Sequence, residues 1–169
     1  MPILDEMKIG IISDSHDHHA NSLKAVDIFN RHKVEYVFHA GDIISPFTAK
    51  AFAAVEGAAF IAVFGNNDGE KLFLKETIEG FGGQIHDESF KGKAGGKKIF
   101  MIHRPGVIPE VVKSAEYDLV IYGHTHKRDI RRENSTLVIN PGESTDWLTG
   151  TPAVVVLDTE KMQPEVVPL

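Results

Sequence analysis

Short apolar runs alternate with stretches of helical periodicity in the first half of the chain. Three of these runs are typical of buried strands, at residues 7–13, 35–40 and 59–64. Apolar residues recurring three and four positions apart predict helices at 23–32, 46–56 and 70–79. Residues 14–21 are polar and turn-like. This strand–helix alternation is typical of a parallel sheet covered by helices.

The second half is richer in strands. Residues 84–90 and 97–102 flank Gly95-Gly96 and predict a hairpin. One more amphipathic helix is expected from Ile108 to Ala115. Further strands are predicted at 118–122, 127–132, 136–139, 153–158 and 165–167, with a turn at 133–135. Because no repeat or long linker interrupts the chain, we expect an α/β fold with layers around a shared core, in a single domain over residues 1–169.

Composition restricts the chemistry more than the fold. The chain has no cysteine, which excludes disulfides, thiolate metal sites and a cysteine nucleophile. Its net charge of -6, with no block of Lys or Arg, argues against a broad nucleic-acid-binding face. We expect no signal peptide, because residues 1–8 have no long apolar segment behind a basic one, and no apolar run approaches the roughly 20 residues of a membrane helix. We therefore expect a cytoplasmic protein with no membrane partner.

Polar side chains that bind metals follow at least four of the predicted strands. They are Asp14, His16, Asp42, Asn66, His103, His124 and His126. The carboxyl ends of parallel strands share one edge of a sheet, so these side chains could converge there. Seven donors are too many for one tetrahedral ion, but they suit two ions bridged by a carboxylate.

The donor types also limit the choice of metal. Oxygen and imidazole ligands without sulfur favour Mn, Fe, Ni or Zn. We expect Mn or Ni to serve best, since four of the seven donors are imidazoles and Mg prefers oxygen. Two ions about 3.5–4 Å apart are typical of two-metal phosphoryl chemistry. Such a pair would also supply the positive charge that this acidic chain lacks.

Each of these residues also has a simpler interpretation when taken alone. Asp14 and Asp42 could cap the helices that follow them, and Asn66 could occupy a left-handed turn. His103 could be a packed or surface histidine. His39, just before Gly41-Asp42, could orient a ligand or only pack. The other histidines are interpreted as solvated or structural: His18, His19, His32 and His86.

The ordered set resembles the calcineurin-like metallophosphoesterase family, in its small prokaryotic phosphodiesterase branch. The matching motifs are Asp14-Ser15-His16, Gly41-Asp42, Gly65-Asn66-Asn67-Asp68, His103, Gly123-His124-Thr125-His126 and Asn140-Pro141-Gly142-Glu143-Ser144. The resemblance implies two packed β-sheets flanked by helices, in four α/β/β/α layers, with the metals at one rim.

The resemblance also implies how the ligands divide. Asp14, His16 and His126 would hold one metal. Asn66, His103 and His124 would hold the other, and Asp42 would bridge the two. A metal-bridging hydroxide would then attack phosphorus in line. The implied activity is that of a dinuclear metal-dependent phosphodiesterase acting on a small phosphodiester. The short gaps between motifs leave no room for a cap domain, so we expect an open site of loose specificity.

Two residues depart from the family pattern. Asn67 stands where many members have a histidine that protonates the leaving group, and an amide cannot do this near neutral pH. This favours activated phosphodiesters. Arg104 follows His103 where small members often carry glycine. It could be a surface residue, or it could clamp a phosphate oxygen through its guanidinium.

Two other functions and two peripheral features stay open. The same fold could serve as a protein-interaction scaffold, as in a retromer subunit, but all seven expected donors are present, which favours an enzyme. A phosphomonoesterase is the other alternative, against which Asn67 argues. Trp147 could lie at a contact in a homo-oligomer or cover the core. Leu4 to Glu6 could form an upstream extension without a role.

Overall fold

The computed structural model describes residues 7–169, so the extension expected at Leu4 to Glu6 lies outside the described residues. The protein has two sheets, and the first has six strands in the order β11-β10-β1-β2-β3-β4. They are β1 (Lys8–Ile12), β2 (Tyr36–His39), β3 (Ala59–Val63), β4 (Gln84–His86), β10 (Ala153–Asp158) and β11 (Gln163–Pro168). The strands β1 to β4 run parallel, and β10 pairs antiparallel with both β1 and β11.

The second sheet has five strands in the order β5-β6-β7-β9-β8. They are β5 (Ser89–Ala94), β6 (Lys97–Ile102), β7 (Leu119–Ile121), β8 (Asp129–Glu133) and β9 (Thr136–Asn140). In this sheet β6, β7 and β9 run parallel, and antiparallel partners close both edges.

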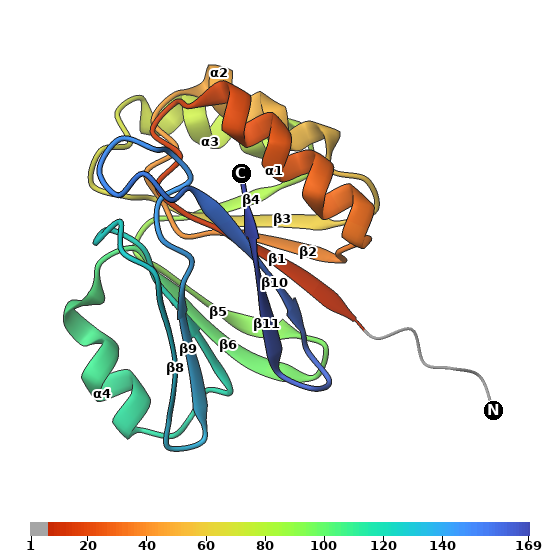
Figure 1. Cartoon of the computed structure of the whole chain (residues 1–169). Helices are drawn as coiled ribbons and strands as arrows, with labels where there is room; N and C mark the ends of the chain where they lie inside the picture. Colours follow the sequence, from red (N-terminus) through yellow and green to blue (C-terminus); the bar gives the residue numbers. More distant parts are fainter. Residues whose placement is uncertain (1–6) are drawn as a thin grey trace.

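Helices cover the outer faces of both sheets (Figure 1). The first sheet is covered by α1 (His19–His32), α2 (Pro46–Ala49), the 3₁₀ helix η1 (Lys50–Ala54) and α3 (Lys71–Gly80). The second is covered by α4 (Ile108–Lys113), which follows the 3₁₀ turn η2 (Pro105–Val107). The four-layer α/β/β/α architecture is therefore confirmed.

Apolar side chains fill three layers instead of the shared core that was expected. Alternate residues of a strand point to opposite faces, so Ile9 and Ile11 of β1 face the second sheet. Ile12 instead joins the cluster beneath the helices, with Phe29 of α1. A third cluster lies between α4 and the second sheet, around Val112 and Val120.

Three predicted elements differ from the structure. The run 84–90 is not one strand, because it breaks at Asp87-Glu88 into β4 and β5, which belong to different sheets. The helix predicted at 46–56 is a short α-helix that continues as a 3₁₀ helix. Helix α1 begins four residues before its predicted start, where the ring of His18 accepts a hydrogen bond from the Asn21 backbone N–H. The hairpin of β5 and β6 around Gly95-Gly96 is confirmed.

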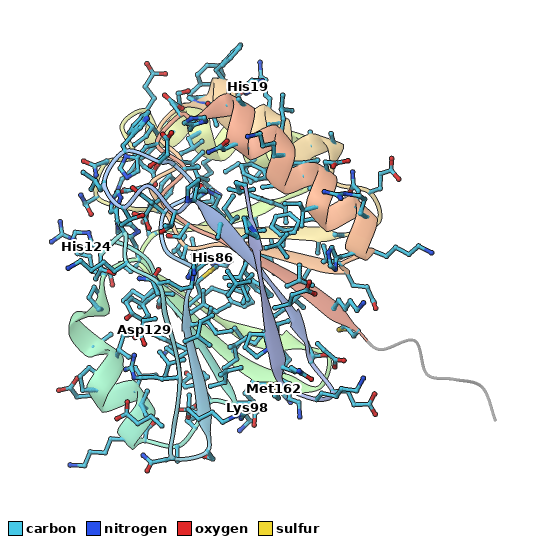
Figure 2. All side chains as sticks on the ribbon, viewed as in Figure 1. His19, His86, Lys98, His124, Asp129 and Met162 are labelled. Carbon is cyan, nitrogen blue, oxygen red and sulfur yellow. The ribbon has the colours of Figure 1, made fainter. Side chains whose placement is uncertain are left out.

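The parallel strands of both sheets end at one rim of the molecule. In Figure 2, His124 lies at this rim, and Lys98 and Met162 lie toward the opposite end of the sheets. The polar residues that follow β1, β2, β3, β6 and β7 therefore meet at one edge, as the sequence predicted. No helix within residues 7–169 has the length and apolar character needed to cross a membrane.

Candidate metal centre

Backbone strain is concentrated at the ends of these strands. Five of the seven predicted donor residues have positive φ angles: Asp14 (52°), His16 (40°), Asp42 (58°), His124 (70°) and His126 (61°). Such angles are uncommon for residues other than glycine, and each costs about 1–3 kcal/mol. The surrounding contacts must hold these turns in place. Strain of this kind is typical of functional sites.

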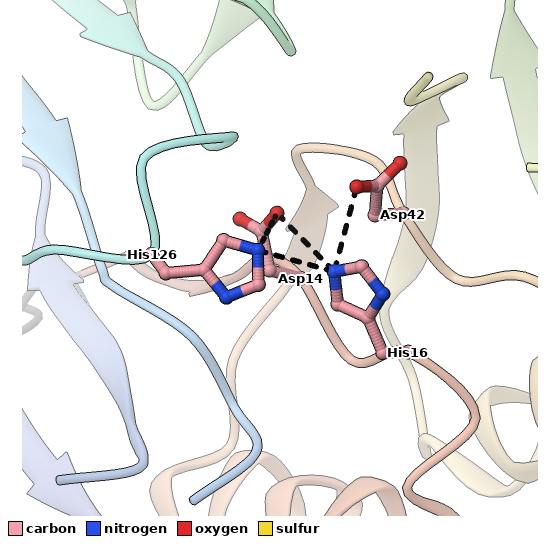
Figure 3. Close-up of side chains that lie close together, drawn as sticks. All are labelled: Asp14, His16, Asp42 and His126. Atoms are coloured by element: carbon pink, nitrogen blue, oxygen red, sulfur yellow. Dashed lines mark hydrogen bonds and ion pairs between the residues drawn. The ribbon is translucent and has the colours of Figure 1, made fainter. Parts of the chain in front are cut away.

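Four of the predicted residues form one compact group, drawn in Figure 3. Asp14, His16, Asp42 and His126 each offer a ligand atom, and these atoms all lie within 4.8 Å of one another. The Nε2 atoms of His16 and His126 are 3.2 Å apart. Asp14 Oδ1 lies 3.8 Å from His16 Nε2 and 3.5 Å from His126 Nε2.

The other three predicted residues form a second group beside the first. Asn66 Oδ1 lies 3.0 Å from His103 Nε2 and 2.8 Å from His124 Nδ1. Asp42 joins the two groups, because its Oδ2 is 3.4 Å from both His16 Nε2 and His103 Nε2. One buried carboxylate is thus shared by donors from the two sides.

The atoms in the first group are suited to a cation. Asp14 Oδ1 is buried and has no hydrogen-bond partner among the described residues, although burying an oxygen unpaired is costly. Its other oxygen, Oδ2, accepts hydrogen bonds from Ser13 Oγ (2.6 Å) and the His124 backbone N–H (3.0 Å). A divalent ion would give the unpaired oxygen a partner.

Two of the imidazoles are held so that Nε2 faces the centre. His103 Nδ1 donates to the carbonyl of Ala40 at 2.7 Å. His126 Nδ1 lies 2.8 Å from Glu143 Oε2. Burial by itself would raise the pKa of Glu143, but hydrogen bonds from His126 and Thr149 lower it to about 2, so this carboxylate accepts and Nδ1 donates. In neutral imidazoles Nε2 then carries the lone pair, as a metal ligand requires.

The electrostatics of the site favour positive charge. The neighbouring Asp14 carboxylate raises the pKa of His16; burial opposes this rise, and the charge of Asp42 adds to it. Burial would lower the pKa of His103, yet Asp42 and Asp14 raise it. For Asp42, burial opposes ionisation, but contacts with His103 and Asn67 lower its pKa below its usual value. The Asp42 carboxylate thus stays charged at neutral pH and stabilises cations beside it.

Two buried acids that had no predicted role support this arrangement. Asp68 accepts backbone N–H bonds from Asp42 (3.1 Å), Ile44 (2.7 Å) and Gly65 (2.6 Å), and so fixes the strained turn after β2. Glu143 orients His126, as described above. Both lie in the quoted motifs, but no sequence pattern marks their distant partners, which are the backbone N–H groups of Asp42 and Ile44 for Asp68 and the ring of His126 for Glu143.

The loops that follow β2 and β3 approach each other closely at Gly65. A Cβ added there would lie 2.1 Å from Asp42 Oδ1, so no larger residue fits.

Two predicted site residues remain, Asn67 beside the shared Asp42 carboxylate and Arg104 beside the second group. The Asn67 backbone N–H and side-chain Nδ2 each donate to Asp42, at 2.8 Å. Arg104 is exposed and lines a cavity of about 260 Å³ together with Asn66 and His103. The rest of this cavity is formed by Phe64, Gly65, Lys71, Asp87, Glu88 and Ile102.

His39, His18 and Trp147 are not among the seven donors, and they lie in three different environments. His39 is fully buried, and its ring contacts Ser15 Oγ (3.0 Å) and the Gly41 N–H (3.2 Å), so it supports the turns and touches none of the seven donors through a hydrogen bond. His18 caps α1. Trp147 does not cover the core, because 62% of its surface is exposed.

A family model described as the calcineurin-like phosphoesterase superfamily domain matches residues 7–162. The chain belongs to this superfamily. It is 45% identical over 160 residues to Phosphodiesterase MJ0936 of Methanocaldococcus jannaschii, a match covering 93% of this chain and 96% of that relative. The resemblance inferred from the motifs is therefore confirmed, and the chain is a hydrolase of the metallophosphoesterase family.

Two solved structures share this fold. A structure described as a novel archaeal phosphodiesterase superimposes with a TM-score of 0.92 at 44% identity, covering 96% of this chain and 100% of that one. Vps29 of Entamoeba histolytica superimposes with a TM-score of 0.69 at 21% identity, covering 96% and 99%. At this lower identity the likeness shows the fold alone.

Proposed function

We propose that the chain is a dinuclear metal-dependent phosphodiesterase acting on small phosphodiesters. The observation that carries this proposal is the position of Asp42 Oδ2, 3.4 Å from both His16 Nε2 and His103 Nε2. A carboxylate shared in this way suits two ions. The 45% identical relative named as a phosphodiesterase supports the same activity.

The residues divide into two ligand sets around Asp42. Asp14, His16 and His126 would hold one ion with Asp42. Asn66, His103 and His124 would hold the other with the same carboxylate. The donor types favour Mn or Ni, with Fe or Zn as alternatives. Two such ions, when bound, supply an activated water and positive charge facing the phosphate oxygens.

The chain itself supplies orientation around this centre. Asn67 anchors both oxygens of Asp42, and Glu143 fixes the ring of His126. Because the Asn67 amide is not an acid, it cannot protonate the leaving alcohol. Esters with stable leaving groups, such as nitrophenyl diesters, should therefore react best.

Arg104 is proposed to clamp a non-bridging phosphate oxygen from the wall of the cavity. Its guanidinium is always charged and can grip two oxygens. A clamp present in both ground and transition states should raise KM in Arg104→Ala with little effect on kcat. Unchanged kinetic constants, with both metals still bound, would make Arg104 a surface residue.

The test of the proposed function is a matrix of metals and substrates. Chelated and dialysed protein is assayed with Mn, Ni, Zn or Mg on bis(4-nitrophenyl) phosphate, 4-nitrophenyl phosphate and cyclic nucleotides. We expect Mn or Ni to restore hydrolysis better than Mg, and the diester to react faster than the monoester. Faster monoester hydrolysis would favour a phosphomonoesterase. No hydrolysis with any metal would favour the scaffold alternative.

A further inference from the structure

The loop between β9 and β10 exposes two large apolar side chains beside the candidate metal centre. Trp147 is 62% exposed and Leu148 73%. The indole ring of Trp147 lies 6.3 Å, centre to centre, from the ring of His16, which belongs to the first donor group. It lies 6.1 Å from the ring of His18. A molecule resting on this indole would therefore adjoin the phosphate site.

The backbone that carries Trp147 is held by the same carboxylate that orients His126. Glu143 Oε1 accepts hydrogen bonds from the backbone N–H groups of Leu148 (3.0 Å) and Thr149 (2.6 Å) and from the Thr149 hydroxyl (2.9 Å). Its Oε2 accepts from the Thr145 hydroxyl at 2.9 Å, in addition to His126 Nδ1 at 2.8 Å.

The start of the loop is also tied to the turn after β1 and to α1. The Ser144 backbone N–H donates to the carbonyl of Ser13 at 3.2 Å. The Asn21 side chain donates to the carbonyl of Ser144 at 2.8 Å. The loop is thus fixed against the metal centre at its start, while the Glu143 carboxylate holds its middle.

An ordered loop that presents an indole to solvent is suited to binding. Burying such a side chain in the core would stabilise the fold by about 1.5–3 kcal/mol or more, and this contribution is absent here. A ring already held in place loses little further freedom when a ligand stacks on it. An exposed aromatic side chain can stack on the base of a nucleotide, whichever base it is, because every nucleobase has a π-face.

We infer that Trp147 is a stacking platform for a planar aromatic group in one arm of the phosphodiester, the nucleobase of a nucleotide being the favoured case. This inference rests on the proposed function. A diester has two organic arms. The cavity beside Asn66 and His103, with Phe64 and Ile102 in its wall, lies next to the second donor group and can take one arm. Trp147 lies next to the first donor group and takes the other.

The chain provides its own probe for this test, since Trp147 is its only tryptophan. Metal-loaded protein, excited at the red edge of indole absorption, is titrated with adenosine 5′-monophosphate or with ribose 5-phosphate, which lacks the base. We expect the adenine compound to quench the fluorescence saturably and the sugar phosphate not to. Equal responses to both compounds would overturn the inference.

Kinetics of matched variants give a second readout. Trp147→Ala should raise KM for bis(4-nitrophenyl) phosphate by about 5-fold to 100-fold, the range expected for losing one stacked ring. KM for methyl 4-nitrophenyl phosphate, whose second arm is small, should change less. Trp147→Phe keeps a ring and should retain most of the affinity. Leu148→Ala, which removes a neighbouring exposed apolar side chain without removing a ring, is the matched control.

The competing occupant of this surface is a second copy of the chain. Light scattering of the wild type and of Trp147→Ala distinguishes the two cases. We expect the same oligomeric state in both proteins. A loss of association in the variant, with equal kinetic changes for all diesters, would overturn the platform in favour of a contact between copies. If no diester is hydrolysed with any metal, the proposed function fails, and the fluorescence titration still decides whether the base stacks.

Discussion

At the scale of single residues, Asp42 is the one at which the two donor groups meet. Its carboxylate lies near His16 and His103 on its two sides, and Asn67 donates to both of its oxygens. The backbone of Asp42 has a positive φ of 58° and is held by Asp68. A residue held under strain by so many partners has a position that the site requires.

Replacing this carboxylate should weaken both ligand sets at once. We expect Asp42→Asn to lower the hydrolysis rate by more than about 100-fold, beyond the loss typical of a residue that only supports a ligand. His16→Ala touches one set and should cost less at equal metal concentration. The measurement is metal content per chain together with initial rate, with circular dichroism as the control for folding. An Asp42→Asn protein with two metals and a near-normal rate would refute the bridging role.

Asn67 allows a second prediction at this scale. In Asn67→His, Nδ1–H could replace the amide donor to Asp42 and leave Nε2 to handle a proton. We expect this variant to speed the hydrolysis of alkyl esters, which have poor leaving groups, more than that of nitrophenyl esters. The measured quantity is the ratio of kcat/KM values for the two ester classes. An equal response of both classes would show that leaving-group protonation does not limit the rate.

At the scale of elements, the turns after the strands connect fold to function. The sequence predicted the strands that end at the rim, because apolar runs followed by Asp, Asn or His are visible in a single chain. It did not predict the break between β4 and β5. A short apolar run such as residues 84–90 does not indicate which sheet each of its halves joins, because strand pairing and register depend on partners that are distant in the sequence. The acceptor roles of Asp68 and Glu143 were missed for the same reason.

His39, the last residue of β2, gives a prediction about acid stability. Burial lowers the pKa of His39 to about 3 from its ordinary value of 6.5, so the folded protein holds this ring neutral. The unfolded chain takes up a proton below about pH 6.5, so this stability is present above that pH and is lost as the pH falls toward 3. Between pH 8 and pH 5 the loss should be about 2 kcal/mol.

The variant His39→Asn isolates this effect. An asparagine can still accept the Gly41 N–H bond but does not titrate. We expect the unfolding free energy of the metal-free wild type to fall by about 2 kcal/mol more than that of the variant between these two pH values. Chemical denaturation at both values measures it. Parallel pH dependences in the two proteins would show that His39 is not the group responsible.

At the scale of the whole molecule, the candidate centre depends on how the two sheets pack. Asp14, His16, Asp42 and Asn66 follow strands of the first sheet, and His103, His124 and His126 follow strands of the second. Contacts such as His124 N–H to Asp14 Oδ2, at 3.0 Å, join the two halves of the site. The motifs predicted which residues lie close together, but a sequence pattern alone does not give the distances between their atoms. The resemblance implied that Asp42 bridges two donor groups, and the structure adds the distances, since its Oδ2 lies 3.4 Å from both His16 Nε2 and His103 Nε2.

The most direct test of the two-ion proposal is to count the ions that activity requires. Chelator-stripped protein receives Mn or Ni in steps, and bound metal per chain is measured beside the initial rate on bis(4-nitrophenyl) phosphate. We predict no activity in the stripped protein and a rate that rises with the second equivalent, reaching its maximum near two ions per chain. Full activity after stripping, or a maximum reached at one ion per chain, would contradict the proposal.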